Sequence, residues 1–131
     1  MAGDGTGPEP AWASVAEEAF CYLTTTGRMS GRPHTIEIWF ALDGPTLYML
    51  SGGGCRSDWV RNLIRASEVS VRIGGRVFSG RGRVVTDRGE DERARRLVHD
   101  KYRPGYGGDL SGWRQRAQPI AVDLHAPGDK A

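Results

Sequence analysis

The most informative stretch of the sequence is Ser51-Gly-Gly-Gly-Cys-Arg-Ser-Asp-Trp-Val-Arg-Asn-Leu63. It follows a short apolar segment at residues 46–50 and leads into a predicted helix. The apolar segment predicts a buried strand. Three consecutive glycines let the backbone turn sharply and come close to a ligand. Ser57 or Asp58 can cap the helix, which we place at 58–66, because either side chain accepts a bond from free backbone N–H groups.

A glycine turn that opens a helix also favours anion binding. The helix start presents N–H donors and the positive end of the helix dipole, and Arg56 adds a full charge beside them. A loop that binds nothing is the alternative, because glycine motifs are weak signals in isolation. The candidate cradle consists of Ser51, Gly52, Gly53, Gly54, Arg56 and Ser57.

The rest of the chain predicts a mainly β (α+β) fold. The order of elements shows no regular strand–helix alternation, which argues against a doubly wound sheet. Gly80 and Gly82 inside one long strand indicate a bulge or a strong bend, as barrel strands need. We therefore expect an antiparallel, partly open barrel of about six strands with two or three appended helices. We place strands at 20–26, 34–42, 46–50, 68–73, 76–86 and 119–124. We place helices at 11–20, 58–66 and 109–117, and a further helix that starts at Asp87 or Glu90 and ends at Tyr102.

Length and composition indicate one globular domain. The chain has 131 residues and a net charge of only +2, so nothing in the charge demands a nucleic acid. No apolar run approaches the roughly 20 residues of a membrane span. Residues 1–10 lack the features of a secretory signal, so we expect a disordered leader, a domain at 11–125 and a tail at 126–131.

Cysteines, histidines and arginines narrow the chemistry further. Cys21 and Cys55 are too few for a disulfide framework or a four-ligand zinc site, and they fit a reducing cytoplasm. The three histidines show no metal-ligand spacing, so we expect no metal site. Almost all positive charge is arginine, whose fork matches phosphate and carboxylate oxygens. The alternative is that most of these side chains are simply solvated.

A second candidate site is the turn Arg28-Met-Ser-Gly-Arg32, which supplies two guanidinium groups and a hydroxyl group. If the fold brings this turn to the glycine loop, the two form a pocket for a large, multiply anionic cofactor. Aromatic side chains provide either flat pocket walls or core packing. They are Trp39, Trp59, Tyr102, Tyr106 and Trp113.

These motifs resemble the deazaflavin-dependent nitroreductase family of actinobacteria. The resemblance rests on Tyr22-Leu-Thr-Thr-Thr-Gly-Arg-Met-Ser-Gly-Arg-Pro-His34, Ile38-Trp-Phe40, Ser51-Gly-Gly-Gly54, Trp59-Val-Arg-Asn-Leu63, Tyr102-Arg-Pro-Gly-Tyr106 and Trp113-Arg-Gln-Arg-Ala-Gln-Pro-Ile120. That family belongs to the split-barrel flavin and deazaflavin oxidoreductases, which are related in fold to pyridoxamine phosphate oxidase. The resemblance implies an antiparallel split β-barrel, commonly a homodimer, that binds coenzyme F420.

The resemblance also implies an activity and a set of site residues. Reduced F420 would pass a hydride to an electron-poor small molecule such as a quinone, an enone or a nitro compound. Trp39 would face the cofactor or the substrate, Tyr102 and Tyr106 would line the substrate side, and the proton would come from Tyr106 or from solvent. The implied cofactor-binding residues are Arg28, Ser30, Gly31, Arg32, His34, Trp39, Ser51, Gly52, Gly53, Gly54, Arg56, Ser57, Trp59 and Asn62.

Two alternatives and two departures from the family pattern accompany this reading. An FMN-dependent enzyme would use the same cleft with fewer arginines, and a non-catalytic protein would only bind the cofactor or lack one. Ile36-Glu37 replaces the family's usual Asn-Pro pair, and the loop between Gly54 and Trp59 is about two residues shorter than in better-known members. A carboxylate at position 37 would repel an anionic cofactor unless it faces away or pairs with an arginine.

Overall fold

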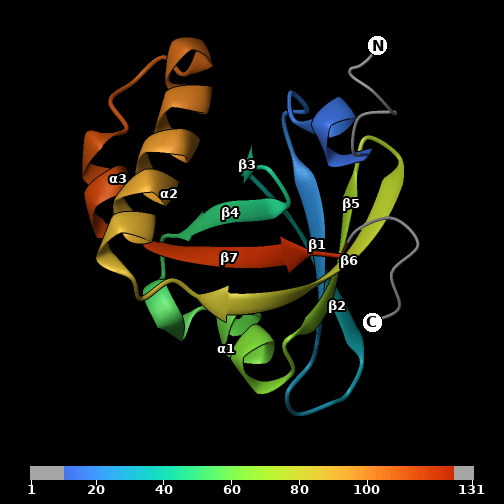
Figure 1. Ribbon diagram of the computed structural model, residues 1–131. Coiled ribbons are helices and arrows are strands. Elements are labelled where there is room, and N and C mark those ends of the chain that lie inside the picture. The colour runs from blue at the N-terminus through green and yellow to red at the C-terminus, as the bar shows by residue number, and fades with distance from the viewer. Residues whose placement is uncertain (1–10, 126–131) are drawn as a thin grey trace.

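The computed structural model describes residues 11–125, which build one curled antiparallel sheet with helices packed on it (Figure 1). The strand order is β2-β1-β5-β6-β7-β4-β3. The predicted fold class, a mainly β split barrel with appended helices, is confirmed. The strands are β1 (Cys21–Thr26), β2 (Pro33–Ile38), β3 (Ala41–Asp43), β4 (Thr46–Ser51), β5 (Glu68–Ile73), β6 (Arg76–Val84) and β7 (Gln118–Leu124).

Residues 11–125 also form three α-helices and three 3-10 helices. Asp87 caps α2, since its carboxylate accepts a bond from the backbone N–H of Glu90 at 2.8 Å. No helix within residues 11–125 is long and apolar enough to cross a bilayer. The α-helices are α1 (Asp58–Arg65), α2 (Arg88–Tyr102) and α3 (Ser111–Arg116), and the 3-10 helices are Ala11–Val15, Gly54–Arg56 and Arg103–Gly105.

The predicted helix at 11–20 is wrong beyond Val15. Only the 3-10 helix Ala11–Val15 forms there, and it suffices to bury Val15 and part of Trp12 against the core. The chain must then extend to enter β1, so the helix cannot continue. The predicted leader at 1–10 and tail at 126–131 lie outside the described residues.

The predicted single strand at 34–42 is also wrong, because Trp39 and Phe40 interrupt it. Before them, β2 pairs with β1; after them, β3 pairs with β4 at the opposite edge of the sheet. Phe40 is fully buried where the chain crosses between these edges. This crossing gives the sheet seven strands instead of about six, and it carries Trp39 to the site described below.

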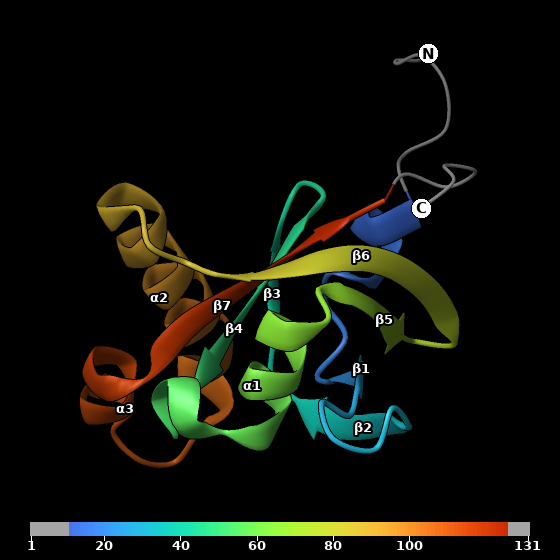
Figure 2. The same ribbon diagram turned by 90° about the horizontal axis from the view of Figure 1, so that it is seen from below.

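Strand β6 bends as its glycines predicted. Its first part pairs with β5 and its second part with β7, and Gly80 and Arg81 pair with both. The register is continuous along both pairings, so the strand bends without a bulge. Figure 2 shows β6 as a long arc that joins the two halves of the sheet.

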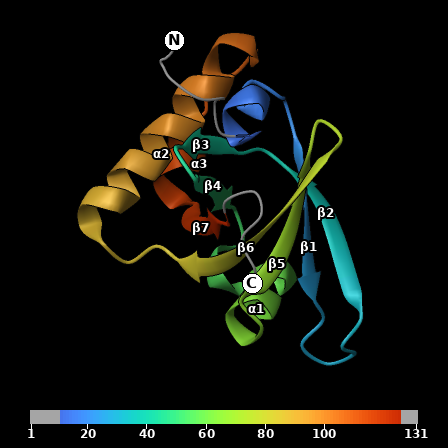
Figure 3. The ribbon, with the colours of Figure 1, turned by 45° about the vertical axis from the view of Figure 1, so that its right-hand side comes forward.

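Two apolar clusters fill the fold. The larger one includes Leu23, Phe40 and Leu63 and lies between the curled sheet and α1. The smaller one joins Tyr48 and Ala121 of the sheet to Ala94 and Val98 of α2. Figure 3 shows β3, β4 and β7 beside α2 on one side, and β1, β2 and β5 on the other.

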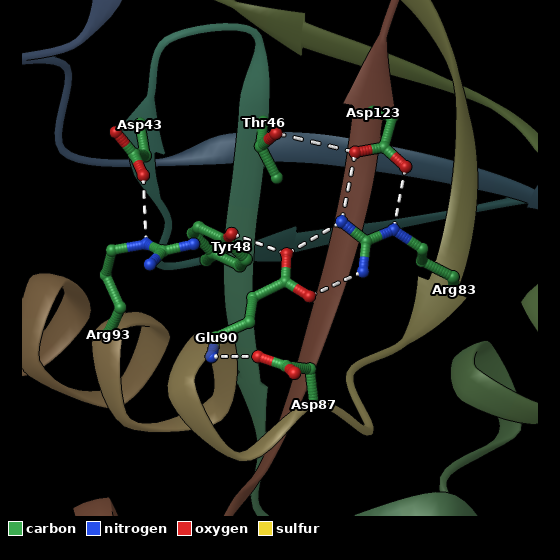
Figure 4. A network of polar contacts seen from close by, with 8 residues as sticks. All are labelled: Asp43, Thr46, Tyr48, Arg83, Asp87, Glu90, Arg93 and Asp123. Atoms are coloured by element: carbon green, nitrogen blue, oxygen red, sulfur yellow. Dashed lines mark hydrogen bonds and ion pairs between the residues drawn. The ribbon is translucent and has the colours of Figure 1, made fainter.

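A polar network fixes the start of α2 to the sheet (Figure 4). Glu90 accepts two bonds from the Arg83 guanidinium, at 2.8 and 2.7 Å, and one from the Tyr48 hydroxyl at 2.6 Å. Arg83 also donates to Asp123 at 2.7 Å. The network therefore joins β4, β6 and β7 to one helix end, which holds α2 in place over the sheet.

Candidate functional site

The β1–β2 turn is fastened to α1, which brings together two of the predicted site segments. Asn62 Oδ1 accepts bonds from the backbone N–H of Arg28 at 3.1 Å and from its Nη1 at 2.9 Å. Arg28 Nη2 also pairs with Asp58 Oδ1 at 3.1 Å. Arg28 therefore joins the turn to the helix.

A cavity of about 590 Å³ opens between this turn, β2 and α1. Its size is in the range of cofactor pockets. The predicted residues Arg28, Ser30, His34, Trp59 and Asn62 line it, and five residues that the sequence reasoning missed line it too. Strand alternation places Ile36 on the same face as His34, so periodicity offered a signal for it. The missed residues are Gly27, Met29, Thr35, Ile36 and Asp58.

The glycine loop is shaped by two constraints. Gly54 has a φ of +63°, and a Cβ on Gly53 would lie 2.4 Å from Ser57 Oγ. Ser51 Oγ donates to the Gly54 carbonyl at 2.8 Å and lies 3.0 Å from Ser57 Oγ. The two hydroxyl groups therefore hold the loop closed.

The predicted side-chain cap of α1 is wrong. Ser57 occupies the N-cap position, but its hydroxyl makes no capping bond and faces Ser51 instead. Asp58 pairs with Arg28. The side chains of Ser57 and Asp58 bind the Ser51 hydroxyl and Arg28, respectively. The backbone N–H donors at the start of α1 are therefore not bound by either side chain.

The glycine loop does not line the large cavity. It lies toward the aromatic residues, where a Cβ on Gly52 would come within 4.0 Å of Trp113 Nε1. Arg32 and Arg56 are exposed, and neither guanidinium pairs with another residue of the described chain. Gly31 (φ +73°) shapes the neighbouring turn.

Four aromatic side chains meet at the end of β2. Trp39 stacks on Tyr102 with ring centroids 4.2 Å apart, and Tyr106 and Trp113 meet it edge-on at 6.0 and 5.6 Å. The fold thus brings together Trp39, Tyr102 and Tyr106, the three residues expected at the substrate. Sequence reasoning missed Lys101 and Arg116, which line the same region.

Two cavities border this aromatic cluster, and Trp39 and Tyr106 line both. One measures about 240 Å³ and the other about 460 Å³. The smaller is also lined by Ala19, Phe20, Lys101, Tyr102 and Gly105, and the larger by Asp109, Leu110, Gly112, Trp113 and Arg116.

Tyr102 serves the cluster as an anchor. Its hydroxyl accepts a bond from the Phe40 N–H at 3.0 Å and donates to the Ala19 carbonyl at 2.7 Å. Burial raises its pKa to about 12. Tyr102 therefore presents its ring to the pocket, whereas Tyr106 is 47% exposed at the pocket mouth.

The family model for F420H2-dependent quinone reductases matches residues 13–125, nearly the whole described chain. The chain belongs to the F420H2-dependent quinone reductase family. It is accordingly an oxidoreductase, and its cofactor is coenzyme F420.

Solved structures agree with the fold of this reductase. An F420-H2-dependent reductase matches with a TM-score of 0.65 at 20% identity, over 79% of this chain and 93% of that one. A Listeria innocua protein named for pyridoxamine 5'-phosphate oxidase matches with a TM-score of 0.64 at 20% identity, over 90% and 95%. A structure described as a domain-swapped dimer matches with a TM-score of 0.65 at 19% identity, over 92% and 87%.

The residues of this reductase fit an anionic deazaflavin. The large cavity offers the Trp59 ring and the start of α1. Arg32 and Arg56, whose guanidinium groups pair with no other residue within 11–125, belong to the turn and the loop next to it in sequence. Glu37 does not line this cavity, and its carboxylate accepts a bond from the Tyr22 hydroxyl at 2.6 Å. Among residues 11–125, no group of three His, Cys, Asp or Glu side chains is arranged to hold a metal ion.

Proposed function

We propose that this reductase passes a hydride from reduced F420 to an electron-poor organic acceptor, with a quinone as the preferred class and enones and nitro compounds as further candidates. The observation that supports this most is the pairing of two different sites within one fold. A cavity bearing an arginine and a helix N-terminus adjoins β2, and an aromatic pocket lies at the end of the same strand.

The cofactor would be held by the large cavity and the segments beside it. Ser30, His34 and Trp59 would contact it directly, and Asn62 and Arg28 would hold the two walls in register. F420 carries a phosphate and an acidic oligoglutamate tail, which suits the guanidinium groups of Arg32 and Arg56. The loop Ser51–Ser57 and Gly31 would complete the cradle through backbone donors.

The aromatic cluster would hold the acceptor. Trp39, Tyr102 and Tyr106 provide flat apolar surfaces that exclude water and orient a conjugated ring. Bound reduced F420 supplies the hydride, which is the difficult chemical step. The proton that the acceptor also needs would come from Tyr106 or from solvent.

The protein would act as a homodimer in a reducing cytoplasm. The relative described as a domain-swapped dimer supports dimerisation. The free thiols of Cys21 and Cys55 are compatible with reducing conditions. Sedimentation of the purified protein at several concentrations measures the oligomeric state.

The proposed function is tested by titrating the purified, cofactor-free protein with oxidised F420 while following tryptophan fluorescence, with FMN in parallel. Reoxidation of reduced F420 is then followed with a soluble quinone, an enone and a nitroaromatic. We expect binding of F420 and turnover of the quinone. Binding of FMN alone would replace the cofactor, and F420 binding without turnover of any acceptor would indicate a cofactor-binding protein.

A further inference from the structure

Lys101 is the second-to-last residue of α2 and lines the 240 Å³ pocket together with Trp39, Tyr102 and Tyr106. It is one of only two lysines in a chain whose positive charge is otherwise arginine. Lysine carries a compact point charge, whereas arginine presents a flat fork suited to paired oxygens. The ammonium group of a lysine in this pocket is therefore suited to bind a single oxygen atom of a ligand.

The contacts of Lys101 leave part of its ammonium group free. Nζ donates to the Phe40 carbonyl at 3.0 Å and lies 3.6 Å from the centroid of the Phe40 ring. An ammonium group has three N–H donors. Within residues 11–125 it forms no ion pair and donates no other hydrogen bond, so even with one N–H toward the Phe40 carbonyl and one toward the Phe40 ring, a donor is left for a ligand in the pocket.

The charge of this group is sensitive to its surroundings. Burial lowers the pKa of Lys101 to about 8, and the carboxylates of Glu17 and Glu18 oppose that effect. The neighbouring thiol and phenol stay neutral, because burial raises the pKa of Cys21 and of Tyr102 to about 12. At neutral pH Lys101 is therefore a half-buried cation beside an aromatic pocket.

We propose that Lys101 binds the acceptor oxygen on which negative charge accumulates during reduction. This inference rests on the proposed function and specifies its acceptor: a flat conjugated ring that carries a carbonyl oxygen at its edge, as a quinone does. The aromatic cluster receives the ring, and the ammonium group lies at the pocket wall to receive the oxygen. A positive group positioned where charge develops favours the reduced state over the starting acceptor.

The test uses a ligand that carries this charge without any reaction. The probe is 2-hydroxy-1,4-naphthoquinone, an acidic quinone that is an anion at neutral pH, and it is titrated into the cofactor-free protein while tryptophan fluorescence is followed. Lys101→Met keeps most of the side chain and removes the charge, and Lys101→Arg keeps the charge. Arg96→Met is the matched control, because it removes an exposed cation from the same helix.

We expect Lys101→Met to weaken probe binding by about tenfold to a hundredfold, as for a lost hydrogen bond to a charged group. The melting temperature and the F420 affinity should be nearly unchanged. Arg96→Met should bind like the wild type. Wild-type affinity should fall as pH rises through about 8, where Lys101 loses its proton, and this fall should be absent in both Lys101 variants.

Wild-type probe affinity in Lys101→Met, or a melting temperature that falls in step with affinity, would overturn the inference. If Lys101→Met does not fold, Lys101→Arg decides, because arginine stays charged and a persisting fall above pH 8 would contradict the proposal. If probe binding depends on Lys101 but the protein does not bind F420, only the proposed function is contradicted. If the protein turns over F420 but probe binding does not depend on Lys101, only this inference is contradicted.

Discussion

A single amide oxygen, Oδ1 of Asn62, receives both the backbone N–H and the guanidinium of Arg28, at 3.1 and 2.9 Å. Asn62 is 5% exposed, and its Nδ2 donates to Thr25 Oγ1 at 3.3 Å. One side chain of α1 therefore holds both the end of β1 and the turn that follows it. The turn and α1 are two of the walls of the large cavity.

Replacing Asn62 with alanine should damage stability and cofactor binding together. Three hydrogen bonds are lost and a part-buried backbone N–H is left without its partner, which costs about 1–3 kcal/mol. Urea unfolding measures the free energy, and F420 titration measures the affinity. A variant with wild-type stability would show that the turn does not depend on this amide.

The two arginines of the turn should behave differently. Arg28→Ala removes the bonds to Asn62 and Asp58, so both the melting temperature and the F420 affinity should fall. Arg32 is exposed and its guanidinium group pairs with no other described residue, so Arg32→Ala should lower affinity about tenfold and leave the melting temperature unchanged. Equal losses of stability in the two variants would contradict this assignment.

Glu90 should make the fold sensitive to acid. The Arg83 guanidinium holds the pKa of Glu90 at about 2, below its ordinary 4.5. Because the folded pKa is depressed, this stabilisation is complete above pH 4.5 and is lost as pH falls toward 2. Glu90→Gln should cost about 1.5–3 kcal/mol at neutral pH, as for lost hydrogen bonds to a charged group, and its urea stability should change less between pH 5 and 3 than that of the wild type.

Arg96→Gln is a suitable control, because it changes one exposed charge on the same helix without touching the network. If Glu90→Gln and the wild type lost stability in parallel over that pH interval, Glu90 would not be the group that titrates.

The two thiols should differ sharply in reactivity. Cys55 is exposed in the glycine loop, whereas Cys21 is fully buried and burial raises its pKa to about 12. Alkylation of the native protein should therefore add one label, and alkylation in denaturant two, as counted by mass. Cys55→Ser should take no label in the native state. Rapid labelling of Cys21 would show that β1 opens readily.

Gly82 should not tolerate a methyl group. A Cβ at this position would lie 2.4 Å from Leu63 Cγ, where α1 packs on β6. Gly82→Ala should cost about 1–3 kcal/mol through overpacking. Gly107→Ala, whose Cβ would meet nothing within 4 Å, is the control. In a double-mutant cycle, Leu63→Ala should relieve part of the cost of Gly82→Ala, and simple additivity of the two changes would argue against the contact.

Local patterns were sufficient for most of the fold. Strand β5 was predicted at its observed bounds, and α1, β1 and β4 within one residue, because apolar alternation and turn residues act over short distances. The interruption of the strand at Trp39 and Phe40 could not be predicted, because both residue types favour strands. It depends on the burial of Phe40 where the chain crosses between the sheet edges.

The candidate site divides in the same way. The sequence shows the residue types that bind an anionic cofactor in the turn at 28–32 and the loop at 51–57, and it shows the aromatic residues that suit a flat acceptor. These types can be predicted because composition and spacing are local properties. Only the tertiary structure decided what each side chain does. Arg28 holds Asn62 instead of standing free, Ser57 meets Ser51 instead of capping α1, and Lys101 comes to lie beside Trp39. These partners lie up to 62 residues apart, as Lys101 does from Trp39, and no local pattern encodes which polar group meets which once the sheet has curled.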